Sequence, residues 1–445
     1  MKRKPDSASL SFVSFAALVA GLDYSMDLFF PESRLLSLNR VVFPVILAGD
    51  FICYPQKYTR GFSICALGLL ILFSCSPFLI FADEGATSFH SMGSEILKLC
   101  GIFMYLLFFY VNCNSERAVK RVCAVMFFGS GAVVFYVLCS HFEIIGARTY
   151  VWHANIEYTR SSGVFDPNIV TLYFLPCFAF GPLLALHSKA FAGFRRGLVL
   201  ITSICVALFA ALQLNSRAGS VAVAATLGTS LAFRSLLTAE DRKRRSRFYS
   251  VGFVALVGFA LAGLQWKYGI FETIVAIYEA TDILTDASFS FRMFAYRYLA
   301  QDLITSPNLV GNVEGYAEYW SLLGWTAYPH CSLADVYIKG GAVFLLAYLY
   351  LLGASTLNCL RGALKDPDPA RRALFAGCLA YFAGLLPLIM TLSIDTSKLP
   401  WAVLGCALGF SAVAARQKVF NRNVLWETTR GPVIYAPSNR WHPHA

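Results

Sequence analysis

Residues 373–392 read ALFAGCLAYFAGLLPLIMTL, a run without a single charged side chain. A helix needs about 20 apolar residues to cross the hydrocarbon core of a bilayer. This run therefore predicts one transmembrane helix, and runs of similar length recur from the N-terminal part of the chain to residue 415.

The composition agrees with this reading. The chain has 445 residues, of which 57% are hydrophobic and 14% are charged, whereas a soluble domain carries about 25% charged residues. We expect an all-α polytopic membrane protein and exclude soluble folds. No polar stretch is long enough to build a second core, so residues 1–415 are predicted to form a single transmembrane domain.

Twelve spans fit the apolar runs. Their predicted limits are 10–30, 35–54, 62–82, 94–112, 120–140, 166–187, 198–214, 217–237, 249–266, 331–353, 373–392 and 400–415. The polar C-terminal tail, residues 416–445, is expected to be cytoplasmic and to have little order.

The distribution of basic residues orients these spans. The net charge is +11, and lysine and arginine gather in alternate connections, most densely in TAEDRKRRSR at residues 238–247. Cytoplasmic loops carry such an excess, which places both termini in the cytoplasm and makes MKRKP the start of an uncleaved first span. The same charge in a soluble protein would suggest nucleic acid; here topology and contact with membrane lipids explain it.

The 13 cysteines include no C-x-x-C pair, and most lie in apolar runs, where cysteine behaves as a small hydrophobic residue. Neither a disulfide framework nor a zinc site is indicated. The predicted outer side has no Asp-x-Asp or acidic cluster, so we expect no metal and no other cofactor.

One long polar stretch, residues 267–330, interrupts this apolar pattern on the predicted outer side. Its helical spacing of apolar residues predicts two or three short helices at the membrane surface. It contains Arg292 and Arg297 and ends at His330, directly before the tenth span. Arg217, in NSRAGS at the start of the eighth span, falls at the same outer interface.

These residue types suit chemistry on a phosphate. The guanidinium group of arginine stays charged and binds two oxygens at once, and histidine can take a proton near neutral pH. Arg217, Arg292 and His330 together match an enzyme that expels a lipid diphosphate and deprotonates an incoming hydroxyl. The alternative is structural: the arginines contact headgroups and the histidine caps a helix.

Acidic residues near other spans leave a transport pathway open. Asp23 and Asp27 lie near the outer end of the first span, and Arg40 and Asp50 lie in the second. Their predicted positions near the interfaces, rather than at midplane, favour ion pairs.

Four segments resemble motifs of the bacterial O-antigen ligase and O-antigen polymerase superfamily, membrane glycan transferases of the GT-C type. RSSGVFDPNIV begins at Arg160, NSRAGSVAVAA contains Arg217, SFRMFAYRYLAQDLITSPNLVGNVEGY contains Arg292, and HCSLADVYIKGG begins at His330. Together they cover residues 160–345.

The resemblance implies a metal-independent, inverting transfer at the periplasmic face of the bacterial inner membrane. The donor would be an oligosaccharide on undecaprenyl diphosphate, and the acceptor a growing glycan or the lipid A core. His330 would be the catalytic base, Arg217 and Arg292 would bind the diphosphate, and Arg160 and Arg297 would be secondary binding residues. A chain-length regulator protein is a possible partner in polysaccharide biosynthesis.

The chain departs from the ligase pattern at Cys331, where the family usually has Asn, Ser or Gln, at Phe344 after the glycine, and at Gly311 and Gly315, which replace Gly-x-Gly. These departures favour the polymerase of surface-polysaccharide (O-antigen or exopolysaccharide) repeat units over the ligase. A twelve-span transporter or lipid-linked sugar flippase is the alternative from another class.

Overall fold

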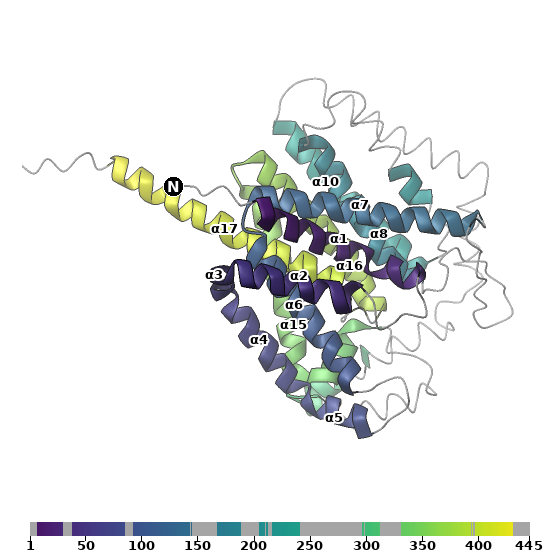
Figure 1. The fold of residues 1–445 in the computed structure, drawn as a ribbon. Helices are drawn as coiled ribbons and strands as arrows, with labels where there is room; N and C mark the ends of the chain where they lie inside the picture. The colour runs from purple at the N-terminus through teal and green to yellow at the C-terminus, as the bar shows by residue number, and fades with distance from the viewer. Residues whose placement is uncertain are drawn as a thin grey trace, which may run out of the picture.

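The computed structural model describes residues 7–29, 38–84, 92–142, 144, 167–187, 204–209, 211, 216–240, 296–297, 299–311, 331–392, 394 and 397–429. Within these ranges the ordered elements are helices, and no residue is in a strand. Figure 1 shows the helices packed into one bundle. In chain order the labelled helices are α1 (Ser7–Phe29), α2 (Leu38–Cys53), α3 (Pro55–Tyr58), η2 (Thr59–Gly61), α4 (Phe62–Ser74), α5 (Ser76–Glu84), α6 (Met92–Asn112), α7 (Glu116–His141), α8 (Pro167–His187), α10 (Arg217–Glu240), α15 (Ser332–Lys365), α16 (Pro369–Thr391) and α17 (Lys398–Thr429).

Four of these helices are long and apolar enough to cross a membrane: α7, α15, α16 and residues 398–415 of α17. Five further apolar helical stretches are shorter, at 10–21, 42–53, 96–112, 169–182 and 218–233. The prediction of an all-α chain with membrane-spanning helices is thus confirmed in this coarser form, while the count of twelve spans stays a prediction. The predicted spans 198–214 and 249–266 lie largely or wholly outside the described residues.

Three helix boundaries differ from the prediction. Helix α15 continues to Lys365, well beyond the predicted end at residue 353. The predicted span 62–82 is divided into α4 and α5 at Cys75, because Pro77 has no N–H to donate to the carbonyl of Phe73. The expectation of little order after residue 415 is wrong for residues 416–429, which continue α17 as a helix. Figure 1 shows this end of α17 projecting from the bundle.

Small residues bring α17 and α6 into close contact. Gly405 and Gly409 form a G-x-x-x-G pattern on α17, and a Cβ atom on either would collide with the backbone carbonyl of Leu106 or Tyr110 on α6. In a bilayer, helices associate through such close packing because lipid removes the hydrophobic drive. The pairing of 405 with 106 and of 409 with 110 also makes α6 and α17 parallel.

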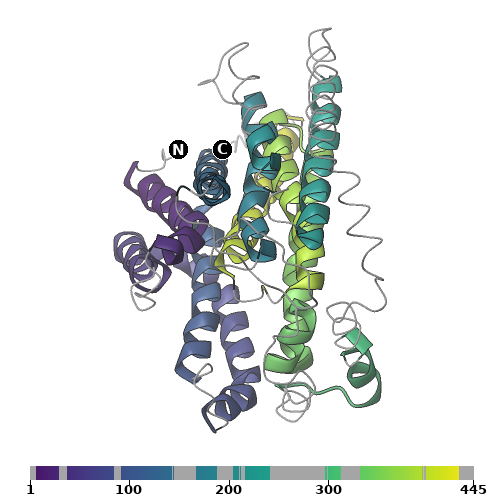
Figure 2. The ribbon, with the colours of Figure 1, turned by 90° about the vertical axis from the view of Figure 1, so that its right-hand side faces the viewer.

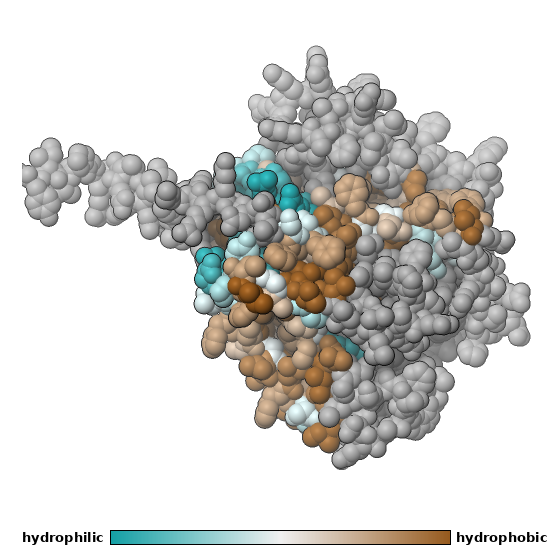
Figure 3. Space-filling model, in the orientation of Figure 1, coloured by the Kyte–Doolittle hydropathy of each residue, from teal (hydrophilic) through white to brown (hydrophobic). Residues whose placement is uncertain are grey.

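Large apolar side chains cover the outside of the bundle. Ile52 and Phe62 are each 77% exposed and Phe73 is 73% exposed, and Figure 3 shows apolar side chains covering much of the described surface on this face. A soluble protein rarely exposes so broad an apolar surface. This face fits contact with lipid tails.

The glycine contact between α17 and α6 yields a stability prediction. Gly409→Ala forces a Cβ into the backbone of Tyr110 and should destabilise the fold by about 1–3 kcal/mol, the usual cost of overpacking. The measurement is the thermal unfolding midpoint of the purified protein in detergent. Gly353→Ala on α15 is the matched control, since a Cβ there meets nothing within 4 Å; equal midpoints for the two variants would contradict the prediction.

Candidate functional site

Helices α8 and α10 begin at the same end of the bundle. A Cβ on Gly219 in the first turn of α10 would collide with the hydroxyl of Thr171 near the start of α8, and further along Ser230 donates to the carbonyl of Ala179 at 3.5 Å. The contacts come in the same order along both helices: Thr171 and then Ala179 on α8, and Gly219 and then Ser230 on α10. The two helices are therefore parallel, with their N-termini side by side.

Helix α16 runs the opposite way and joins α15 to this pair. A Cβ on Gly384 would lie 3.2 Å from Leu175 of α8, and Tyr381 stacks on Phe180, with ring centroids 6.3 Å apart. The C-terminal end of α16 therefore lies where α8 and α10 begin. Helix α16 packs against α10 and against α15.

Helix α15 also begins at this end. The hydroxyl of Ser332 donates to the carbonyl of Leu392 at 2.5 Å and accepts from the N–H of Ile394 at 2.9 Å. Ser332 is fully buried, so its side chain links the first residue of α15 to the connection after α16. We call the region where α8, α10 and α15 begin and α16 ends the loop end of the bundle.

The end of the large polar stretch also docks at the loop end. The hydroxyl of Tyr296 donates to the carbonyl of Met390 on α16. Arg297 is also helical and its side chain is exposed, and residues 299–305 are helical as well. Figure 2 shows this green segment leading to α15.

Helix α15 is broken at Gly341, whose φ of 63° lies in the left-handed region that only glycine adopts without strain. The break leaves backbone N–H groups without partners in their own helix. Ala342 donates to the carbonyl of Asn308 at 2.8 Å and Val343 to that of Leu309 at 3.3 Å. A segment of the large polar stretch thus supplies the hydrogen-bond acceptors that α15 lacks at its break.

An ion pair is buried in the first turns of α15. The ammonium of Lys339 lies 2.7 Å from the carboxylate of Asp335, and their side chains are only 6% and 1% exposed. Neither residue was among the predicted site residues, although opposite charges four apart within a predicted span signal such a pair. In the sequence, Asp335 and Lys339 follow soon after His330.

The predicted site residues divide into two groups. The backbone of Arg217 begins α10 at the loop end, and Arg297 lies there with an exposed side chain. Arg160, Arg292 and His330 lie outside the described residues. His330 nevertheless directly precedes Cys331, the N-cap of α15.

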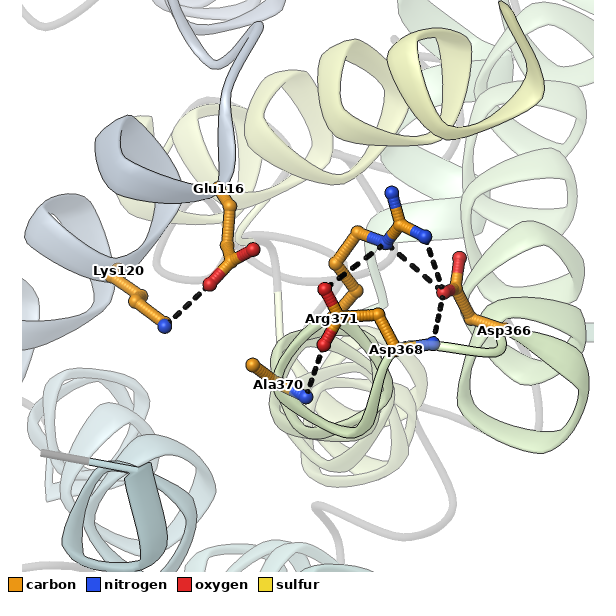
Figure 4. A network of polar contacts seen from close by, with 6 residues as sticks. All are labelled: Glu116, Lys120, Asp366, Asp368, Ala370 and Arg371. Carbon is orange, nitrogen blue, oxygen red and sulfur yellow. Dashed lines mark hydrogen bonds and ion pairs between the residues drawn. The ribbon is translucent and has the colours of Figure 1, made fainter. Parts of the chain in front are cut away.

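The opposite end of the bundle carries polar groups that close helix ends. Arg371 lies 3.0 Å from Asp366, and Asp368 accepts from the N–H of Ala370 at 2.8 Å (Figure 4). Beside them, Lys120 and Glu116 form an ion pair of 2.5 Å on α7 (Figure 4). These contacts cap α16 and connect adjacent turns, and they leave the loop end as the better candidate for chemistry.

Asp50 belongs to a buried polar cluster near the end of α2. Its carboxylate accepts from the hydroxyl of Tyr58 and from the amide of Asn112, both at 2.8 Å, and Lys57 lies 3.4 Å away. Burial, and then the bond and charge of Asp50, raise the pKa of Tyr58 well above its ordinary value. The side chains of Asp23, Asp27 and Arg40 lie outside those described. Asp50 is held in a closed network.

Within the described residues, no group of three or more histidine, cysteine or acidic side chains is arranged to hold a metal ion. The thiols of Cys123, Cys359, Cys378 and Cys406 are instead buried in the apolar core between the helices. All 13 cysteines are free.

No protein-family model matches the chain, and no curated protein matches it significantly.

The buried hydroxyl of Ser332 yields a second prediction. Ser332→Ala should destabilise the fold by about 1–3 kcal/mol for each buried backbone group that loses its partner, here those of Leu392 and Ile394. The measurement is chemical or thermal unfolding in detergent. Ser411→Ala is the control, because that hydroxyl bonds only to Ala407 one turn back in the same helix. A Ser332→Ala variant as stable as the control would show that this link contributes nothing.

Proposed function

We propose that this protein transfers a glycan from undecaprenyl diphosphate to an acceptor hydroxyl, as the polymerase of surface-polysaccharide repeat units. The reaction is inverting and metal-independent and takes place where the loop end meets the periplasm. The chain is a multi-pass protein of the bacterial inner membrane with cytoplasmic termini.

One observation carries the proposal: the motif segments lead to one end of the bundle. Contacts of Thr171 with Gly219, and of Ser332 with Leu392, bring the starts of α8, α10 and α15 to the same end. The motif residues Arg160, Arg217 and His330 precede or begin these three helices. Sequence resemblance alone did not require the three starts to share an end, so this supports one reaction centre.

The chemistry follows from the residue types. The acceptor oxygen attacks the anomeric carbon while the bond from that carbon to the diphosphate oxygen breaks. His330 takes the proton of the acceptor hydroxyl, and the lipid diphosphate leaves with the bonding electrons. Arg217 and Arg292 stabilise the negative charge that grows on the leaving group, and Arg160 and Arg297 are secondary binding residues.

A transporter is less well supported. Transporters place broken helices and polar residues at midplane between two related halves. Here the break in α15 is completed by the large polar stretch, and the Asp50 cluster closes on itself. Neither feature leaves an evident path through the described part of the bundle.

Complementation tests the function. We expect wild-type protein to restore long polysaccharide ladders in a polymerase-null strain and His330→Ala to abolish them, because the acceptor proton then has no base. The readout is surface polysaccharide on a gel, with matched membrane levels of both proteins. A strain lacking the ligase is the parallel host; restoration there alone would make the protein a ligase. An active His330→Ala variant would remove the catalytic assignment.

The diphosphate-binding role of Arg217 is tested in vitro. Arg217→Ala should lower the turnover of purified protein with its lipid-linked donor by about 10²–10³-fold, the usual effect of losing one group that stabilises developing charge. Arg217→Lys keeps the charge but loses the planar guanidinium group, so its turnover should lie between those of the wild type and Arg217→Ala. Arg361→Ala, at the other end of the bundle, is the control. Turnover unchanged in Arg217→Ala would exclude this arginine from the reaction.

A further inference from the structure

We infer that Asp302 is a positioning residue of the proposed site: it fastens the end of the large polar stretch to the start of α15 and so aligns the arginines of that stretch with His330. The inference rests on the proposed function. It assigns a role to Asp302, which lies within a motif segment but has no role in the reaction proposed above.

The segment that Asp302 holds, residues 302–311, is bound to the bundle by three backbone hydrogen bonds. Its Asn308 and Leu309 carbonyls accept from Ala342 and Val343 beyond the break in α15, and its Gly311 N–H donates to the carbonyl of Ser74 at the end of α4 at 2.8 Å. We call this segment the strap. The strap therefore joins α15 to α4.

The fit of the strap is close on both sides. A Cβ on Gly311 would collide with the carbonyl of Lys339, and a Cβ on Gly341 would collide with the carbonyl of Val310. Both glycines are therefore required for the two backbones to approach. The strap and the break in α15 are therefore complementary in shape, and each requires a glycine at the contact.

Asp302 stands at the start of the strap and carries its side-chain contacts. Its carboxylate accepts from the hydroxyl of Tyr337 on α15 and from the side-chain amide of Asn308 at 3.1 Å. The Tyr337 oxygen in turn accepts from the N–H of Asn308 at 3.1 Å. Hydrogen bonds to a charged acceptor are about twice as strong as neutral ones, so Asp302 is the strongest polar link between strap and helix.

Position connects this link to the proposed reaction. Arg297 precedes Asp302 by five residues in the sequence, both lie in helical segments, and Tyr296 beside Arg297 bonds to α16. Tyr337 lies in the first part of α15, seven residues after His330 in the sequence. The Asp302–Tyr337 bond therefore ties the part of the chain that contains Arg292 and Arg297 to the part that contains the proposed base. A shift of about 1 Å in such a site can cost about 10²-fold in rate.

The test uses the full chain in lipid nanodiscs, with Asp302→Ala and Tyr337→Phe as separate variants. Tyr337→Phe removes one hydroxyl without adding volume, so it should fold even where Asp302→Ala does not. Gln301→Ala is the matched control, since Gln301 is exposed in the same short helix. Two quantities are measured: hydrogen exchange of the strap and of Ala342 and Val343, and the affinity for undecaprenyl diphosphate.

We expect both variants to lose exchange protection in the strap and to bind undecaprenyl diphosphate about tenfold or more weakly, the scale of a lost hydrogen bond to a charged group, while the control matches wild type. Lost protection with unchanged affinity would reduce Asp302 to a structural role, and retained protection would show that it does not fasten the strap; either result overturns the inference. Wild-type protein that does not bind undecaprenyl diphosphate would instead refute the proposed function, and the positioning role with it.

Discussion

Backbone hydrogen bonding is the constraint on which the rest of this structure depends. Inside a bilayer an N–H or carbonyl group has no water to bond with, so irregular backbone is tolerated only where protein completes it. The break at Gly341 meets this condition through the carbonyls of Asn308 and Leu309. The large polar stretch is consequently part of the bundle at its C-terminal end, and the loop end of the fold is organised around that contact.

The sequence predicted what depends on apolar length. Residues 373–392 were expected as one helix, and α16 covers Pro369–Thr391; the expected spans 94–112 and 166–187 agree similarly with α6 and α8. The predicted alternation of direction also agrees with α8 parallel to α10 and antiparallel to α16. Such features are local, because each helix satisfies its own backbone.

What the sequence did not predict depends on distant partners. Gly340 and Gly341 look like ordinary glycines of a membrane helix, and only the strap, some thirty residues earlier in the chain, reveals why the helix breaks there. The division between α4 and α5 at Cys75 could have been predicted from Pro77, but the continuous apolar run favoured a single span. Of the candidate site, Arg217 and Arg297 are placed at the loop end in backbone terms, whereas the convergence of side chains depends on His330, Arg292 and Arg160, beyond the described residues.

The parallel contact between α6 and α17 has a consequence for biosynthesis. A chain made from its N-terminus inserts α6 long before α17 exists, yet the carbonyls of Leu106 and Tyr110 lie against Gly405 and Gly409, which are translated much later. Until then this side of α6 faces lipid or the insertion machinery. Helices that insert first and associate later are usual in membranes, and here α17 packs against a surface that α6 presents from an early stage of synthesis. A nascent or truncated chain would therefore present an unfinished groove, which quality-control proteases could recognise.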